Sequence, residues 1–77
     1  MKKIQILGPG CPNCERLAGL TERVARELGI EFELQKVTEI TEIVQFGVMA
    51  TPGLVLDGKV LVSGRVPTEA EVKEWLS

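Results

Sequence analysis

The sequence of 77 residues predicts an α/β fold with the element order β-α-β-α-β-β-α. Three observations support this prediction. A short apolar run followed by an amphipathic helix and a second apolar run forms a strand–helix–strand unit. Asp57-Gly58 stands between two runs rich in leucine and valine, which is the pattern of a two-residue β-hairpin. A capping box at residues 68–71, Thr-Glu-Ala-Glu, then opens a final helix.

The first part of the chain contains two predicted strands and a long helix. The first strand covers Lys2–Leu7, and the second covers residues 30–37, where apolar and polar residues alternate loosely. The helix covers about residues 12–28, and Gly29 is suited to end it. Its apolar residues recur at helical spacing: Leu17, Ala18, Leu20, Val24, Ala25 and Leu28. Because one helix joins the two strands, we expect them to be parallel with a right-handed crossover.

The second part contains a short helix, the hairpin and the final helix. Thr38 is predicted to cap a helix over residues 39–46 that Gly47 ends, with Ile40, Ile43 and Val44 facing inward. The hairpin strands cover residues 54–56 and 59–62. The final helix would face the sheet with Val72, Trp75 and Leu76. No repeat or linker interrupts the chain, so we expect a single domain over residues 1–77.

Composition and charge narrow the class of protein. A hydrophobic fraction of 44% with 26% charged residues is typical of a soluble globular protein. The formal charge of −2, with neither sign in a block, gives no basic patch for nucleic acid. No apolar run is long enough to span a membrane and no signal peptide opens the chain, so we expect a cytoplasmic monomer.

Chemistry is concentrated in Cys11-Pro12-Asn13-Cys14, which holds the only two cysteines. The sequence has no histidine, so Cys–His catalysis within one chain is excluded. Two cysteines without histidine also do not complete a mononuclear zinc site. We therefore expect no metal site and no bound cofactor other than a redox-active disulfide. In a reducing cytosol, a close cysteine pair is more often catalytic, redox-sensing or metal-binding than structural.

The position of this pair at the start of a helix predicts different roles for its members. The first turn of a helix has free backbone N–H groups and partial positive charge, which favour a thiolate, the nucleophilic form. Pro12 suits the first helical position because its fixed φ is helical and it needs no N–H partner. Cys11 would then be the exposed nucleophile at the helix cap. Cys14, one turn inside and shielded, would be the resolving cysteine.

The Cys-Pro-x-Cys motif after the first strand, Thr51-Pro52 before the hairpin, and the element order resemble the thioredoxin/glutaredoxin superfamily. Within it the whole chain is similar to the miniature, glutaredoxin-like "redox-active disulfide" proteins. The resemblance implies a thioredoxin-like fold with a four-stranded mixed sheet in the order 2-1-3-4, flanked by helices. It also implies a cis Pro52 beside the cysteines and a substrate strand paired with Thr51. With Pro12 and Asn13, these residues form the expected substrate-binding site.

Two departures from the superfamily pattern concern protons and glutathione. Thioredoxins bury an aspartate six residues before the nucleophile, whereas this chain has Gln5, which does not titrate. Glu15, Lys36 or a water molecule would therefore have to take the place of that aspartate in moving the Cys14 proton. For glutathione, only Arg16 and Arg65 offer the basic groups that glutaredoxins use around their site.

We therefore expect a thiol–disulfide oxidoreductase that exchanges its Cys11–Cys14 couple with protein or small-molecule disulfides. A thioredoxin-reductase-like protein or a low-molecular-weight thiol would restore the dithiol. One alternative is a purely structural disulfide, which would stabilise the fold only weakly because the loop that it closes is short. A second is a Cys-x-x-Cys carrier of Cu(I), zinc or arsenic. Small copper chaperones have the order β-α-β-β-α-β, however, which differs from the order predicted here.

Overall fold

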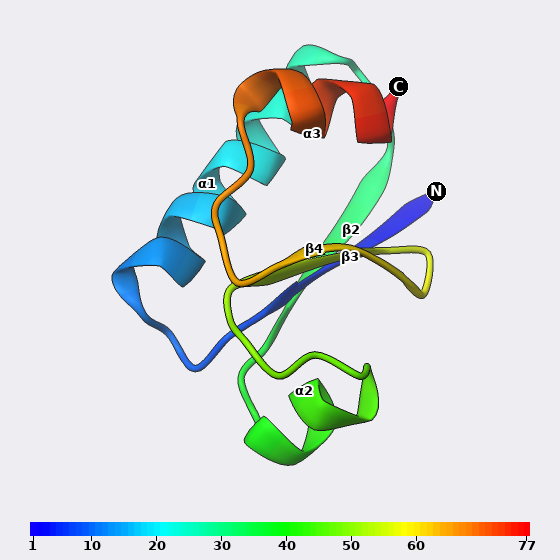
Figure 1. Ribbon diagram of the computed structural model, residues 1–77. Coiled ribbons are helices and arrows are strands. Elements are labelled where there is room, and N and C mark those ends of the chain that lie inside the picture. Colours follow the sequence, from blue (N-terminus) through cyan, green and yellow to red (C-terminus); the bar gives the residue numbers. More distant parts are fainter.

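The computed structural model describes residues 1–77 and contains seven elements in the predicted order (Figure 1). They are β1 (Lys2–Leu7), α1 (Pro12–Glu27), β2 (Phe32–Val37), α2 (Ile40–Gln45), β3 (Gly53–Leu56), β4 (Lys59–Ser63) and α3 (Glu69–Leu76). The second strand starts two residues later than predicted. None of the three helices has both the length and the apolar character needed to cross a membrane.

The four strands form one mixed sheet in the order β2-β1-β3-β4. β1 is parallel to β2 and antiparallel to β3, and β3 is antiparallel to β4. In this register Ile4 lies between Leu34 and Leu56, so β1 has a hydrogen-bonded neighbour on each side. The predicted fold class and strand order are therefore confirmed.

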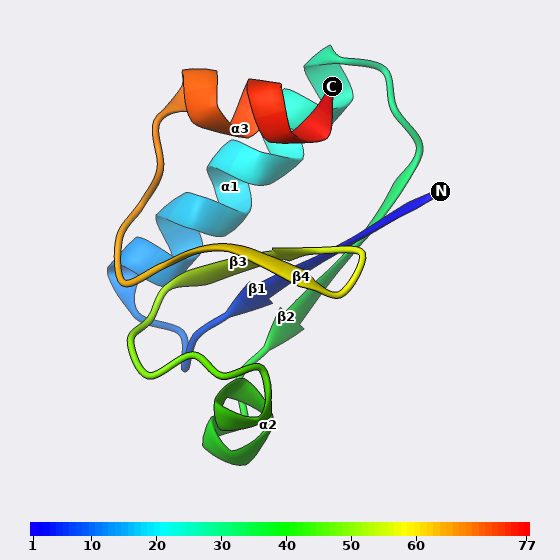
Figure 2. The same cartoon turned by 45° about the vertical axis from the view of Figure 1, so that its right-hand side comes forward.

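Helices cover both faces of the sheet, with α1 and α3 on one face and α2 on the other (Figures 1 and 2). Alternation along β1 decides which residues face each layer, because successive side chains of a strand point to opposite faces. Ile4 and Ile6 join the larger core cluster beneath α1 and α3, together with Leu17, Ala18, Val24, Ala25, Leu54, Val62, Val72 and Leu76. Leu7 joins a smaller cluster toward α2, with Val37, Ile43, Val48 and Val55.

Two local sequence signals produce the structures they predict. Asp57 and Gly58 both have positive φ, 49° and 85°, as a type I′ hairpin turn requires. The Asp57 carboxylate also accepts a hydrogen bond of 2.9 Å from the backbone N–H of Lys3. At α3, the Thr68 hydroxyl accepts from the Glu71 N–H while the Glu71 carboxylate accepts from the Thr68 N–H, which completes the capping box.

The predictions for α2 were partly wrong. Glu39, not Thr38, is the N-cap residue, and no side-chain hydrogen bond caps this helix. Only Ile43 is buried, whereas Ile40 and Val44 are 61% and 58% exposed. The physical reason is length, because a helix of six residues has fewer than two turns and contacts the sheet with one side chain.

The inward face of α1 also differs slightly from the predicted one. Leu28 is the C-cap and is exposed, since the helix ends at Glu27. Thr21 is completely buried in the same helix, although a polar residue was not expected there.

Candidate active site

The cysteine pair lies where β1 passes into α1. β1 ends at Leu7, and Gly10, with φ of 98°, turns the chain before the helix. Cys11 is the N-cap of α1 in an extended conformation, and Pro12 occupies the first helical position. The predicted location of the pair at a helix N-terminus is thus observed.

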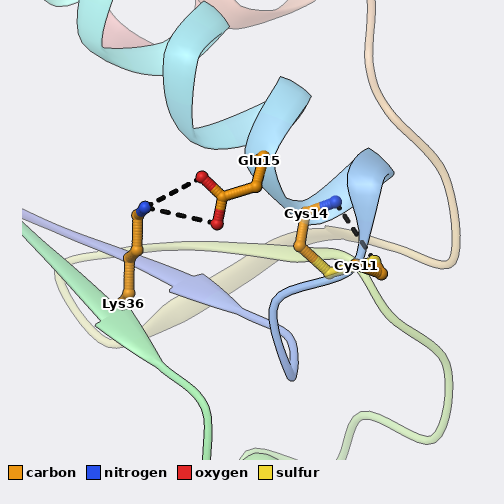
Figure 3. Close-up of a disulfide and its surroundings, with 4 residues drawn as sticks. All are labelled: Cys11, Cys14, Glu15 and Lys36. Atoms are coloured by element: carbon orange, nitrogen blue, oxygen red, sulfur yellow. Dashed lines mark hydrogen bonds and ion pairs between the residues drawn. A yellow bond between two sulfur atoms is a disulfide. The ribbon is translucent and has the colours of Figure 1, made fainter.

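Cys11 and Cys14 form a disulfide across this first turn, with their Cα atoms 5.0 Å apart (Figure 3). The backbone N–H of Cys14 donates to Cys11 Sγ over 3.2 Å, and the N–H of Glu15 donates to the Cys11 carbonyl over 3.0 Å. Cys11 is partly exposed, whereas Cys14 is only 4% exposed. An incoming reactant therefore has access to Cys11 and not to Cys14. The N–H that points at Cys11 Sγ would stabilise a thiolate there.

Pro12 and Asn13 separate the cysteines on the solvent side of this turn, and both are exposed. Arg16, in the same stretch of α1, is exposed and has no ion-pair partner.

Gly8 is a site residue that sequence analysis missed. A Cβ atom built on Gly8 would overlap Cys14 Sγ and would lie 3.8 Å from Thr51 Cβ. Gly8 is buried, and its N–H donates to the Val37 carbonyl over 2.9 Å. Its φ is not in the left-handed region, so the lack of a side chain serves packing and not backbone conformation. No signal in a single sequence separates such a glycine from an ordinary bend.

The segment before β3 also lies beside Gly8. The peptide bond between Thr51 and Pro52 is cis, Pro52 is buried and Thr51 is partly buried. The Pro52 carbonyl accepts a hydrogen bond of 2.9 Å from the N–H of Gly64. The structure thus brings Thr51 close to Cys14 around Gly8, and it ties Pro52 to the end of β4.

Two polar pairs join different elements, and one of them includes Glu15, which directly follows Cys14. Lys36 on β2 contacts the Glu15 carboxylate, with Nζ 3.1 Å and 3.3 Å from its two oxygens (Figure 3). The amide of Gln5 donates to the Gln35 side chain over 3.3 Å. Two of the residues named as candidates for proton handling, Glu15 and Lys36, are therefore paired with each other.

Arg65, which follows Gly64, is held by α3. Its guanidinium donates to both carboxylate oxygens of Glu71, over 2.9 Å and 2.8 Å. The hydrogen bond from Arg65, reinforced by that from the Thr68 N–H, lowers the pKa of Glu71 to about 2. The same pair raises the pKa of Arg65. Arg65 is therefore paired with Glu71. Of the two arginines considered for glutathione binding, only Arg16 has no ion-pair partner.

The side chains that commonly ligate metal ions are scattered in this structure. No group of three or more His, Cys, Asp or Glu side chains is placed to hold a metal ion.

Comparison with known proteins agrees with this geometry. A family model described as "Thioredoxin domain" matches residues 2–77. A thioredoxin of Methanothermobacter thermautotrophicus is 43% identical over 77 residues, which cover all of both chains. A thioredoxin of Methanocaldococcus jannaschii is 38% identical over 76 residues, covering 99% of this chain and 87% of that protein. The chain therefore belongs to the thioredoxin domain family, and its Cys11–Cys14 pair identifies it as a thiol–disulfide oxidoreductase.

Proposed function

We propose that this chain reduces disulfides of protein substrates, with Cys11 as the nucleophile and Cys14 as the resolving cysteine. The observation that supports these roles is the unequal exposure of the two sulfurs in one helical turn. A substrate disulfide can approach the partly exposed Cys11, whereas the buried Cys14 is within reach of Cys11 alone. The helix N-terminus and the Cys14 N–H favour the thiolate at the accessible position.

The proposed exchange has two displacement steps. The Cys11 thiolate attacks one substrate sulfur, so that the substrate S–S bond breaks and the other substrate sulfur leaves as a thiolate. The Cys14 thiolate then attacks Cys11 Sγ in the mixed disulfide and displaces the second substrate thiolate. Two electrons pass from the dithiol to the substrate, and the two protons of the dithiol leave with the substrate thiols or go to solvent. The product is the Cys11–Cys14 disulfide seen in the structure.

Thr51 and Pro52 supply the proposed docking edge for the substrate backbone. Neither the N–H nor the carbonyl of Thr51 takes part in a backbone hydrogen bond within the chain, whereas the Pro52 carbonyl is already used by Gly64. An extended substrate segment could therefore pair with Thr51 as an added strand. Exposed Pro12 and Asn13 would contact the substrate on the other side of Cys11.

The reductant that restores the dithiol is either a thioredoxin-reductase-like protein or a low-molecular-weight thiol in the cytoplasm. The engagement of Arg65 with Glu71 supports the first source, because it leaves Arg16 as the unpaired cation for a glutathione carboxylate. Recycling by a reductase and by reduced glutathione can be compared directly by following alkylation of Cys11.

The test uses two variants in a disulfide reduction assay with insulin as the substrate. Cys11→Ser should abolish reduction, whereas Cys14→Ser should accumulate a mixed disulfide through Cys11 that resists resolution. Circular dichroism of both variants checks that the fold is retained. Full reductase activity in Cys11→Ser would refute the assignment of the nucleophile.

A redox titration distinguishes this function from metal or metalloid carriage. We expect a reversible two-electron transition between roughly −180 and −280 mV, the range of working oxidoreductases. The observed order β-α-β-α-β-β-α already differs from that of the small copper chaperones. A dithiol that forms no disulfide and binds Cu(I) tightly would support the carrier instead.

A further inference from the structure

The ion pair between Glu15 and Lys36 connects the cysteine turn to the sheet (Figure 3). Glu15 follows Cys14 directly, and its N–H donates to the Cys11 carbonyl. It is the only acidic residue in the first turn of α1. Lys36 belongs to β2, beside Ile6 of β1, so the pair joins two elements that are far apart in sequence.

The Glu15 carboxylate and a Cys11 thiolate would carry the same charge at the same helix end. The N-terminus of a helix stabilises negative charge, and here two negative groups share that field. Each disfavours the ionised form of the other, because two like charges at one helix end repel. An unpaired Glu15 would therefore oppose the reactive form of Cys11.

Lys36 supplies the charge that offsets this repulsion. Its Nζ lies within 3.3 Å of both carboxylate oxygens of Glu15. Of the two arginines considered for the site, Arg16 is exposed without an ion-pair partner, and Arg65 is bound to Glu71. Lys36 is thus the cation that contacts the first-turn carboxylate.

We propose that Lys36 is a positioning residue for the redox reaction, which preserves the Cys11 thiolate by holding and neutralising the Glu15 carboxylate. This inference rests on the proposed function of Cys11 as the nucleophile. It has a distinctive consequence for single and double variants. Loss of Lys36 should disfavour the thiolate, loss of the Glu15 charge should favour it, and loss of both should leave it nearly unchanged.

The test compares Lys36→Met, Glu15→Gln and the double variant with the parent chain. Ultraviolet absorbance of the thiolate is followed against pH in a Cys14→Ser background, where Cys11 alone titrates. The expected change for each single variant is about threefold in the thiolate–thiol ratio, in opposite directions, as for partly exposed charges at a helix end. High salt should reduce both changes, because it screens exposed charges.

The second measurement is the reduction potential of the chain with both cysteines. It is made in a glutathione buffer, at a pH where the titration shows Cys11 to be mostly thiolate. A threefold change in thiolate stability corresponds to about 14 mV for a two-electron couple. Lys36→Met should lower the potential and Glu15→Gln should raise it. Glu22→Gln is the matched control. Like Glu15, Glu22 is a carboxylate of α1 in an exposed ion pair, here with Arg26, but it lies two turns beyond Cys14.

The proposed role of Lys36 would be overturned if the thiolate–thiol ratio changed in the same direction in both single variants. It would also be overturned if neither the ratio nor the reduction potential changed more than in Glu22→Gln. A purely structural ion pair would lower thermal stability in both single variants and leave the thiolate ratio alone. Failure of the proposed function gives a different result. In that case the parent chain itself shows no reversible exchange with the glutathione buffer.

Discussion

The sulfur of Cys14 occupies the space that a side chain at Gly8 would fill. Gly8 follows the end of β1, and Cys14 lies on the first turn of α1, so the strand and the helix meet at this contact. The same missing side chain leaves room beside Thr51, which precedes the buried Pro52. Packing at one glycine thus determines how closely the resolving cysteine approaches the proposed substrate edge.

Gly8→Ala should destabilise the fold and disturb the disulfide. The added methyl group overlaps Cys14 Sγ, and overpacking of this kind costs about 1–3 kcal/mol. Urea unfolding of the oxidised and reduced forms measures this loss, and the redox titration measures the effect on the couple.

Gly19→Ala is the matched control for this substitution. Gly19 lies on the exposed side of α1 with no atom near its Cβ position. Alanine there should stabilise the helix by roughly 0.5–1 kcal/mol. If Gly8→Ala were as stable as Gly19→Ala, the close packing of Gly8 on Cys14 would be refuted.

Much of the fold could be predicted from the sequence because local signals produce it. The apolar run of β1, the helical spacing in α1, the Asp57-Gly58 turn and the Thr68 capping box each depend on neighbouring residues alone. The position of Cys11 at the helix cap follows from the same local rules. The strand order and the place of Thr51-Pro52 beside the cysteines came from the family resemblance.

The remaining features depend on contacts between distant residues. The role of Gly8 requires knowledge of where the Cys14 sulfur lies, and the Glu15–Lys36 pair requires the packing of α1 on β2. The exposed side of α2 was wrongly predicted because spacing cannot reveal how little sheet a short helix covers. These features arise at the tertiary level, where a single sequence has no direct signal.

Glu71 should make the stability of the fold depend on acidic pH. Its pKa is about 2 in the folded chain and near 4.5 as its ordinary value, so the folded state favours the ionised form. The resulting stabilisation is present above about pH 4.5 and is lost as the pH falls toward 2. Glu71→Gln should therefore lower the urea midpoint at pH 7 and lose less stability than the parent chain between pH 5 and pH 2.

Glu74→Gln provides the control for that pH profile, since Glu74 lies on the same helix without an ion-pair partner. Its urea midpoint should follow the parent chain across the acidic range. An identical acid response in Glu71→Gln and Glu74→Gln would contradict the stabilising role of the Arg65–Glu71 pair.

Leu54→Ala should remove a large part of the stability. Leu54 is completely buried in β3, in register with Ile6 and Val62. Truncation of such a leucine costs about 2–5 kcal/mol, against a total of about 4–12 kcal/mol for a chain of this length. Leu28→Ala, at the exposed C-cap of α1, should cost much less. Equal urea midpoints for the two variants would show that Leu54 is not central to the core.

Thr21→Val should stabilise the fold. The Thr21 hydroxyl is buried in α1 and has no hydrogen-bond partner, so folding removes it from water without replacing the lost hydrogen bonds. Valine has nearly the same shape and fills the site without a polar atom. We expect a gain of about 1 kcal/mol, which corresponds to roughly 4–8 °C in Tm for a domain of this size.

Thr41→Val separates the effect of burial from that of the residue type. Thr41 is an exposed threonine on α2, so its hydroxyl stays hydrated in the folded chain and its replacement should bring no gain. A lower Tm in Thr21→Val than in the parent chain would mean that the hydroxyl is hydrogen-bonded in solution, for example to the carbonyl one turn earlier. A rise in Tm in Thr21→Val but not in Thr41→Val would instead show that burial of the Thr21 hydroxyl destabilises the fold.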